Sequence, residues 1–484
     1  MGTPGAHGEE GADPRRWKAL TVCLVAGFMS LLDVSIVNVA LPSIRVGLHA
    51  PPSDLQWVVS GYALAFGLVL VPAGRFGDTH GRRNAFVFGV VLFTLSSMVA
   101  GASPGSTWLV VARVVQGAAG GVINPQVSGL IQQLFRGEER GRAFGLLGAT
   151  IGISTAIGPL LGGLLIQLGG QQEGWRYVFY VNIPIGVLAI VLAYRYIPGG
   201  GAGRRREDMD PVGVLLLAAG IFLVLLPLVE GQRWHGSARW LLIPAGLLVL
   251  AGYTAWERWY GRRHEPMVDL SLFQRRSYAL GALLGLLYFG GFTAIFFILT
   301  QYLQEGLRYS ALQAGLASTA FALGSAPSAA LGGRVVTRIG RPLVAIGLVL
   351  ITIGLAAVDL VVRLVPAHRV AWTIAIPLFV AGLGNGLVIT PNQTLTLSEV
   401  PVAKAGTAGG VLQTGQRIGA SVGIAAVGSA FFSQVASTHG DYALAFRHAL
   451  LVNIAFILAA LVAALTDVLA DHRRRASTPT RTPP

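Results

Sequence analysis

The sequence carries little charge for its length. Only 12% of its 484 residues are Asp, Glu, Lys or Arg, whereas 53% are hydrophobic. Soluble domains contain about a quarter charged residues, so this composition excludes an ordinary water-soluble protein. Apolar runs of about 20 residues, the length that crosses a ~30 Å hydrocarbon core, recur along the whole chain. We therefore interpret it as an all-α protein embedded in a lipid bilayer.

Cysteine and lysine are also scarce. The single cysteine, Cys23, excludes a disulfide bond within the chain and a cysteine-based metal site. Lysine occurs only at Lys18 and Lys404, so nearly all of the basic charge is arginine. Together with 64 glycines, this usage is typical of a GC-rich bacterial genome, and we expect the protein in a bacterial cell membrane.

Catalytic and nucleotide-binding motifs are missing as well. The sequence contains no P-loop, no evident pairing of a nucleophile with a base and no cluster of metal ligands. Without a P-loop the chain cannot be an ATP-driven pump unless a partner supplies the nucleotide site. These absences predict a protein that is not an enzyme and that holds neither a metal nor an organic cofactor.

The apolar runs predict fourteen membrane helices. Residues 1–17 are polar and the first run is long enough to span the bilayer, so we expect a signal anchor and no cleaved signal peptide. The predicted helices cover residues 18–41, 54–73, 84–103, 108–134, 143–167, 177–197, 211–230, 239–258, 277–304, 310–332, 342–363, 371–395, 404–432 and 446–469.

The basic residues alternate from one connection to the next. Most of the 36 Lys and Arg residues fall in the termini and in every second connection between the predicted helices. Basic connections stay on the cytoplasmic side of a membrane, so we expect both termini in the cytoplasm and an even number of helices. This sorting also accounts for the net charge of +14 without a nucleic-acid partner.

Composition divides the chain into two helical halves. The stretch from 199 to 211 is rich in glycine and arginine, as in a flexible linker, and two helices with few polar residues follow it. The predicted organisation is a cytoplasmic tail over residues 1–17, a six-helix bundle over 18–198, a linker with two inserted helices over 199–262, a second six-helix bundle over 263–470 and a disordered basic tail over 471–484.

A charged segment between the second and third predicted helices organises this division. Residues 74–83 read GRFGDTHGRR, which places several charges where the bilayer core would not tolerate them. We therefore predict a short loop, with glycines that permit a tight turn. The members that we expect to matter are Gly74, Asp78, Gly81, Arg82 and Arg83.

Two pieces of the first half recur in the second. The segment 333–341 matches 74–82 in the Gly-Arg pair at each end but replaces Asp78 by Thr337. Residues 114–121 in the fourth predicted helix resemble 379–386 in the twelfth, in the same order along the chain. Repeated halves around a site near the bilayer midplane are typical of transporters.

Three charged residues lie inside predicted helices at a similar depth. At ~1.5 Å rise per residue, Asp33 lies ~22 Å from the start of its helix at the cytoplasmic side. Arg113 lies ~9 Å from the opposite side, and Arg417 falls near the same level. An interaction between Asp33 and Arg113 is therefore possible. Intramembrane charges mark functional sites by default, although Asp33 could instead cap a helix and Arg113 could bind only backbone carbonyls.

The fifth predicted helix carries a Gly-Pro-x-x-Gly-Gly pattern at Gly158, Pro159, Gly162 and Gly163. Small residues one turn apart allow close helix contact, and Pro159 should bend the helix.

Asp359 lies in another helix with no evident partner. Other intramembrane polar residues include Asn182, Gln126, Gln393 and Gln416. The candidates for a substrate cavity are Asn38, Gln116, Asn124, Asn385, Asn392, Gln413 and Arg417, although each alone more often joins two helices.

These motifs resemble those of the major facilitator superfamily. The pattern over 74–83 is similar to its signature between helices 2 and 3, and the run from Arg113 to Gly117 resembles its helix 4 motif. The run from Gly158 to Gly163 resembles the helix 5 motif of its exporters. The stretches 33–42 and 175–186, and Gln413-x-x-x-Arg417, look like those of its fourteen-helix drug:proton antiporters. Thr79 departs from the family, which commonly has a basic residue there.

The resemblance implies a mechanism. Two six-helix bundles would rock around a central cavity, Asp33 would carry the exchanged proton, and Arg113 would tune it. Asp78 and the neighbouring arginines would steady one conformation through the opposite bundle, where the start of a helix near residues 405–407 suits a carboxylate. The implied partners are protons, lipid and a small amphiphilic substrate. We expect a monomer driven by a proton gradient.

Substrate identity stays open at this point. A drug exporter and a dedicated exporter of one endogenous metabolite, lipid or self-made antibiotic would share the same motifs. A proton symporter for uptake is disfavoured by the helix 5 motif. A membrane enzyme or a sensor that transports nothing is disfavoured by the missing catalytic motifs and by the lack of a sizeable soluble domain.

Overall fold

A computed structural model describes residues 15–199, 210–229, 237–309 and 311–477, and these residues are helical or connect helices. The first half contains α1 (Arg16–Leu48), α2 (Pro52–His80), α3 (Arg82–Gly101), α4 (Ser106–Leu134), α5 (Gly137–Tyr180) and α6 (Asn182–Tyr196). Two helices follow, α7 (Pro211–Val229) and α8 (Leu242–Tyr260). The second half contains α9 (Arg276–Gln301), α10 (Ala311–Ile339), α11 (Arg341–Leu364), α12 (Val370–Thr373), α13 (Ala375–Thr396), α14 (Ala405–Ser437) and α15 (Tyr442–Ser477).

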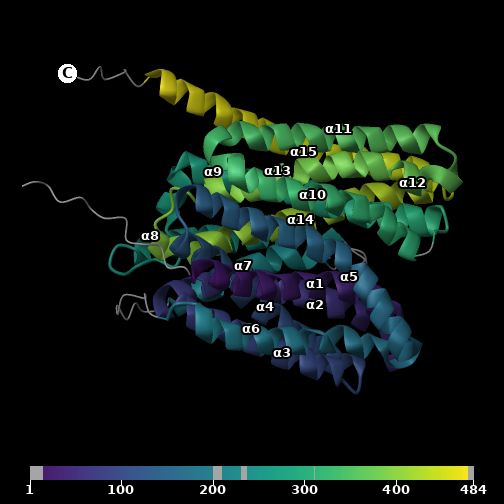
Figure 1. The fold of residues 1–484 in the computed structure, drawn as a ribbon, viewed down its shortest axis with the longest axis horizontal. Coiled ribbons are helices and arrows are strands. Elements are labelled where there is room, and N and C mark those ends of the chain that lie inside the picture. Colours follow the sequence, from purple (N-terminus) through teal and green to yellow (C-terminus); the bar gives the residue numbers. More distant parts are fainter. Residues whose placement is uncertain (1–14, 200–209, 230–236, 310, 478–484) are drawn as a thin grey trace, which may run out of the picture.

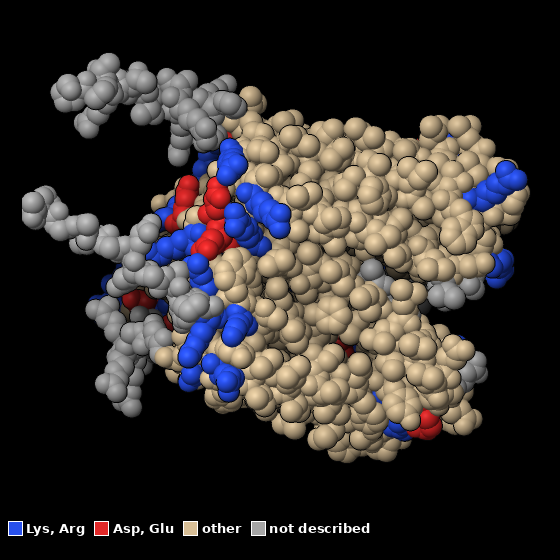
Figure 2. All heavy atoms as spheres, in the orientation of Figure 1, with Lys and Arg blue, Asp and Glu red and all other residues tan. Residues whose placement is uncertain are grey.

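Most of these helices are long and apolar enough to cross a bilayer. Among the described residues, 12 helices meet that condition, or 13 if the two parts of the bent helix α5 count as one span. Figure 2 shows the matching distribution of charge, with charged side chains gathered mainly at one end of the molecule and almost none across the broad middle. The protein is therefore a multi-pass membrane protein.

The helices form two packed groups (Figure 1). In the first group α4 lies against α2 and α3, and α1 lies against α5 and α6. In the second group α13 lies against α10 and α11, and α9 lies against α14 and α15. The pair α7 and α8 pack together, and α7 also contacts α2 and α14. The two groups meet along α5 with α10 and along α2 with α14.

Equivalent glycine contacts relate the two halves. A Cβ added to Gly117 of α4 would lie 2.2 Å from the backbone oxygen of Tyr62 on α2. In the second half, a Cβ added to Gly382 of α13 would lie 2.0 Å from the backbone oxygen of Phe321 on α10. Only a residue without a side chain permits either approach. The recurrence of 114–121 as 379–386 thus corresponds to a repeated helix crossing.

The charged segment over 74–83 is helical for most of its length, so our prediction of a loop is wrong there. Gly74 and Asp78 lie on α2, which continues to His80. Gly81 alone separates α2 from α3, with φ of 97°, and Arg82 and Arg83 already belong to α3. Charges are tolerated here because Arg75 pairs with Glu265 and Asp78 pairs with Arg82. Gly340 makes the equivalent break between α10 and α11, with φ of 72°.

Several other boundaries differ from the predicted ones. α1 continues to Leu48, and α5 runs on to Tyr180 through a non-helical Gly170 with φ of 77°. α15 extends to Ser477, so the predicted disordered tail over 471–484 is helical in its first part. The remainder of that tail, most of the tail 1–17 and the linker segment 200–209 lie outside the described residues.

Close helix crossings generate a prediction about stability. Gly423 of α14 lies against α9, where an added Cβ would come within 1.9 Å of the Gly290 carbonyl oxygen. We expect Gly423→Ala to force the two helices apart and to lower stability by about 1–3 kcal/mol, measured as the midpoint of thermal unfolding of the purified protein. Gly415→Ala, on the same helix but with open space for the new methyl group, is the control. Equal midpoints for the two variants would contradict the packing argument.

Candidate functional site

Asp33 and Arg113 form an ion pair inside the first helix group. Arg113 Nη1 donates to Asp33 Oδ2 over 2.5 Å, and Arg113 Nε donates to the Val58 carbonyl over 3.0 Å. The exposed fractions of the two charged residues are 0% and 2%. The interaction that helix depth made possible is therefore present, and neither residue serves only as a partner of the backbone.

Two amides complete the environment of the Asp33 carboxylate. Gln116 Nε2 and Asn182 Nδ2 each donate to Asp33 Oδ1 over 2.9 Å. Gln116 also donates to Ser97 Oγ over 2.7 Å and accepts from Arg113 over 2.7 Å. Side chains of α4 and α6 thus converge on the carboxylate of α1, and Ser97 of α3 accepts from both amides. Sequence reasoning missed Ser97, because a lone serine in an apolar helix is common and carries no distinguishing pattern.

Aromatic rings of α2 cover the arginines. The Arg113 guanidinium lies 4.2 Å from the centre of the Tyr62 ring, and the Arg417 guanidinium lies 4.4 Å from the centre of the Phe66 ring. Such contacts suit a cation in a poorly solvated site. Tyr62 and Phe66 were not predicted, although their spacing of one helical turn puts both on one face of α2. One face of α2 therefore contacts both arginines.

The Gly-Pro-x-x-Gly-Gly motif lies against α1 next to the ion pair. An added Cβ on Gly158 would lie 2.3 Å from Ser35 Cβ, and one on Gly162 would lie 2.9 Å from Ile36 Cγ1. The helix bends by 40° between its Gly137–Thr155 and Leu160–Gly170 parts, a break that includes Gly158 and Pro159. The predicted bend is confirmed. Gly163 has no atom within 4 Å of its added Cβ, so it does not share in this close approach.

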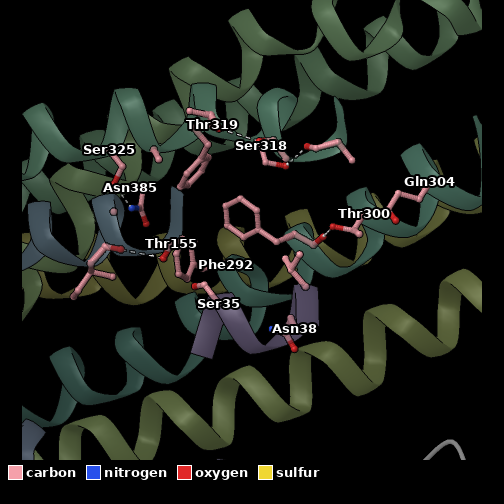
Figure 3. A pocket seen from close by; sticks show the side chains of 18 of the residues that line it. Ser35, Asn38, Thr155, Phe292, Thr300, Gln304, Ser318, Thr319, Ser325 and Asn385 are labelled. Carbon is pink, nitrogen blue, oxygen red and sulfur yellow. Dashed lines mark hydrogen bonds between the residues drawn. The ribbon is translucent and has the colours of Figure 1, made fainter. Parts of the chain in front are cut away.

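A cavity of about 370 Å³ lies between the two helix groups, and Figure 3 shows the side chains that line it. Its walls come from the C-terminal halves of α1 and α9, the middle of α5, the first half of α10 and one residue of α13. The lining residues are Ser35, Asn38, Val39, Pro42, Ile151, Gly152, Thr155, Phe292, Phe296, Thr300, Gln304, Ala314, Gly315, Ser318, Thr319, Phe321, Ala322, Ser325 and Asn385.

Two of the seven residues predicted for a substrate cavity line this one, Asn38 and Asn385. The other five do not line it, and their part in substrate binding stays a prediction. Gln116 binds Asp33, Asn124 donates to Gly120, Asn392 donates to Gly281, Gln413 donates to Ser128 across the two groups, and Arg417 lies on Phe66. Polarity alone does not reveal which way a helix face turns.

Asp78 joins the two helix groups at the charged face. Its Oδ2 accepts from the Thr407 backbone N–H over 2.8 Å and from the Thr407 hydroxyl over 3.0 Å, and its Oδ1 accepts from the Gly406 N–H over 3.1 Å. These donors are the first residues of α14, where a carboxylate is favourable. The predicted contact of Asp78 with the opposite helix group is confirmed.

Neighbouring residues strengthen this junction. Arg82 donates to Asp78 over 2.7 Å, to the Gly129 carbonyl over 3.0 Å and to the Val402 carbonyl of the opposite group. Gly74 packs so tightly on Gly406 that an added Cβ would lie 2.4 Å from its carbonyl oxygen. Arg83 points away and lies over the Tyr194 ring at 5.8 Å.

Further ion pairs surround the junction on the charged face. Arg75 of α2 pairs with Glu265 at 3.3 Å, and Lys404 pairs with Asp269 at 2.9 Å. Burial acts to raise the pKa of Asp269, but hydrogen bonds from Ser271 and Lys404 outweigh it and hold that pKa below its usual value. The Lys404 contact is therefore present at neutral pH. At this end the two helix groups are closed against each other.

Asp359 has partners that the sequence did not reveal. It pairs with Arg363 at 2.6 Å and with Arg447 at 3.1 Å. Both arginines are partly exposed and all three residues lie on the outer part of the second helix group, away from the cavity lining. This cluster ties α11 to α15.

Known proteins match this chain over most of its length. A family model described as Major Facilitator Superfamily matches residues 23–424 and, in a second match, residues 281–482. The chain is 38% identical over 441 residues to a probable actinorhodin transporter of Streptomyces coelicolor, covering 90% of this chain and 76% of the relative. It is 32% identical over 482 residues to the puromycin resistance protein pur8 of Streptomyces alboniger, covering 97% and 94%.

Solved structures share the fold. The proton:xylose symporter XylE superposes with a TM-score of 0.65 at 18% identity, covering 92% of this chain and 95% of that one. The human organic anion transporter MFSD10 superposes with a TM-score of 0.65 at 15% identity, covering 93% and 100%. At these identities the likeness concerns the arrangement of the helices alone.

The buried ion pair generates a prediction about stability. Arg113→Ala leaves the Asp33 carboxylate buried without its cation, which we expect to cost about 3–5 kcal/mol. Asp33→Asn leaves the Arg113 guanidinium without its anion, but the Val58 carbonyl, Gln116 and the Tyr62 ring still contact it, so this variant should cost less. Unfolding midpoints of the two purified variants provide the comparison. In the control, Arg363→Ala, a half-exposed partner of Asp359 is lost, with an expected change of about 0–1 kcal/mol. An Arg113→Ala midpoint no lower than that of Asp33→Asn would contradict this account.

Proposed function

Because this chain belongs to the major facilitator superfamily, and is therefore a membrane transporter and not an enzyme, we propose that it is a proton-coupled exporter of small amphiphilic compounds. The observation that carries the proposal is the fully buried Asp33–Arg113 pair. A carboxylate in the membrane that already has an arginine partner suits a group that exchanges a proton and changes its partners as it does so. The proton gradient is the energy source.

Protonation of Asp33 changes the packing around it. A neutral carboxyl group no longer needs Arg113, and its hydrogen bonds with Gln116 and Asn182 weaken. These partners belong to different helices of the first group, so the proton alters how those helices fit together. Proton and substrate are coupled when they bind with different affinities to the two conformations. In the proposed cycle, protonation accompanies substrate release and deprotonation toward the cytoplasm restores substrate affinity.

The conformation described here fits one half of that cycle. The charged face is closed by Asp78 and its neighbours, and the cavity lies toward the opposite side. Basic residues favour the cytoplasmic side, and α1 and α15 have their terminal ends at the charged face (Figure 1). We assign that face to the cytoplasm, with both termini there, and identify the conformation as one that faces outward.

The topology that we propose has fourteen spans. α10 is 29 residues long and packs between α5 and α13, so it spans the membrane in spite of its many small residues. The bent α5 is a single span. The proposed organisation is then a six-helix bundle over 18–198, a linker with the inserted pair over 199–262 and a second bundle over 263–470, acting as a monomer.

The names of the relatives support export. The number of compounds that this protein exports has to be measured. One is named as a tetracenomycin C resistance and export protein of Streptomyces glaucescens, 32% identical over 434 residues. Several relatives are named for one antibiotic each, which favours the second candidate, a dedicated exporter of a single endogenous compound. All the relatives named here are bacterial, in keeping with a bacterial cell membrane. Proton flux with many unrelated compounds supports a multidrug exporter, and flux with one compound class supports the dedicated one.

The first functional prediction concerns the proton carrier. In inside-out vesicles or proteoliposomes, the wild-type protein should move protons when a substrate is added, and Asp33→Asn should abolish this movement because an amide cannot take up the proton. The variant should purify as a folded protein and still exchange substrate down its own gradient. Arg363→Ala serves as a matched change of a charged residue outside the site. Normal proton-driven export by Asp33→Asn would refute the assignment.

The second functional prediction concerns the cytoplasmic junction. Asp78→Asn removes the negative charge that Arg82 and the first N–H groups of α14 bind. Each lost charge-assisted contact is worth roughly 1.5–3 kcal/mol, so the outward-facing conformation loses stability. We expect the transport rate to fall about tenfold or more, whereas substrate affinity at equilibrium changes much less. Glu138→Gln, at a partly exposed pair with Arg338 on the same face, is the control. An unchanged rate in Asp78→Asn would count against the junction.

A further inference from the structure

The cavity between the helix groups has features that define the chemistry of its ligand. We propose that it binds an uncharged, flat aromatic compound that carries several hydroxyl groups able to donate hydrogen bonds. This inference rests on the proposed function, since it names the substrate class of the same transporter. Three properties of the described cavity residues support it. They are the absence of formal charge, a wall of phenyl rings, and hydroxyl groups that already donate their hydrogen atoms to backbone carbonyls.

Charge is absent from the cavity wall. None of the described residues that line it is Asp, Glu, Lys or Arg. Asp33, two positions before the lining residue Ser35, is 0% exposed and already paired with Arg113. A charged ligand would therefore give up its water without finding a counterion, which costs several kcal/mol. An uncharged ligand avoids that cost.

Phenyl rings form one wall. Phe321 of α10 lies edge-to-face with Phe296 at 5.0 Å between ring centres, and it contacts Phe292 at 5.9 Å. All three rings belong to the cavity lining. Packed rings favour a flat aromatic ligand, which can add to them in stacked or edge-to-face geometry. The volume of about 370 Å³ lies within the ~300–1,000 Å³ that small-molecule sites use.

Four hydroxyl groups of the cavity can act toward a ligand as hydrogen-bond acceptors. Ser318, Thr319 and Thr155 each donate to a carbonyl one turn earlier, over 3.0, 2.9 and 2.9 Å. Thr300 does the same over 2.8 Å. A hydroxyl has one hydrogen and two lone pairs, so these groups can now only accept. Figure 3 shows them on several sides of the same cavity. A ligand that donates from several edges, such as a polyphenol, fits this pattern.

Direct binding to the purified full-length protein tests the inference without a proton gradient. Resveratrol is a flat, uncharged polyphenol, its trimethyl ether has the same rings without hydrogen-bond donors, and ethidium is a flat aromatic cation. We expect resveratrol to bind about tenfold or more tightly than either of the others in equilibrium dialysis. Equal binding of the trimethyl ether, or tighter binding of ethidium, would overturn the proposal.

Variants of the cavity wall provide a second readout. Phe321→Ala should weaken resveratrol binding about tenfold, whereas Leu323→Ala, on the same helix but 64% exposed, should leave it unchanged. Thr319→Val keeps the shape and removes one acceptor, so it should weaken resveratrol a few-fold and leave the trimethyl ether unaffected. This second variant decides the question if Phe321→Ala does not fold. Loss of affinity for both ligands, or for neither, would count against hydrogen-bond donation by the ligand.

The result separates this inference from the proposed function. Selective binding of resveratrol without any substrate-driven proton movement would refute proton-coupled export while supporting the substrate class. Proton movement driven by ethidium, with no selective binding of resveratrol, would support the exporter and refute the substrate class.

Discussion

An ionised carboxylate has to be stabilised inside a membrane, and the first half of this protein is built around that requirement. Asp33 is removed from water, so its charge must be balanced by a cation and by hydrogen-bond donors. Arg113 of α4 supplies the cation, and Gln116 of α4 and Asn182 of α6 supply the donors. Three helices, α1, α4 and α6, are therefore held in register by one carboxylate. A change in the charge of Asp33 therefore weakens the contacts that hold these helices in register.

The two halves share a backbone plan and divide the work unequally. Gly117 and Gly382 make equivalent crossings, and Gly81 and Gly340 make equivalent breaks. Among the described residues, however, the Asp33–Arg113 pair lies in the first half, and the second half supplies the phenyl rings and most of the hydroxyl groups of the cavity. In the proposed mechanism one half responds to the proton and the other contributes most of the contacts available to a substrate. The two halves can share a fold and still differ in this way, because a few glycines determine the helix crossings. The other side chains determine which ions and ligands each half can bind.

The sequence predicted features that depend on position along a helix and missed those that depend on rotation about it. Hydropathy located the helices, and depth brought Asp33 level with Arg113. The direction in which a helix face turns is decided by packing against its neighbours, so Asn392 and Gln413, although polar, do not line the described cavity. Charges are costly in lipid, so the charges over 74–83 predict a loop. The segment is instead helical, because α2 extends past the apolar region of the membrane. Tyr62 and Ser97 belong to residue types too common in membrane helices to stand out.

The geometry separates the proton site from the cavity and restricts how they can be coupled. Asp33 faces into the first helix group, whereas Ser35 on the next face of α1 lines the cavity and presses on Gly158 of α5. Proton and substrate therefore do not compete for one carboxylate in this conformation. In the proposed mechanism, a change at Asp33 reaches the cavity through a shift or rotation of α1, which the close contact with Gly158 transmits to α5 and to the second helix group. Coupling of this kind needs no charge on the substrate, in agreement with an uncharged cavity wall.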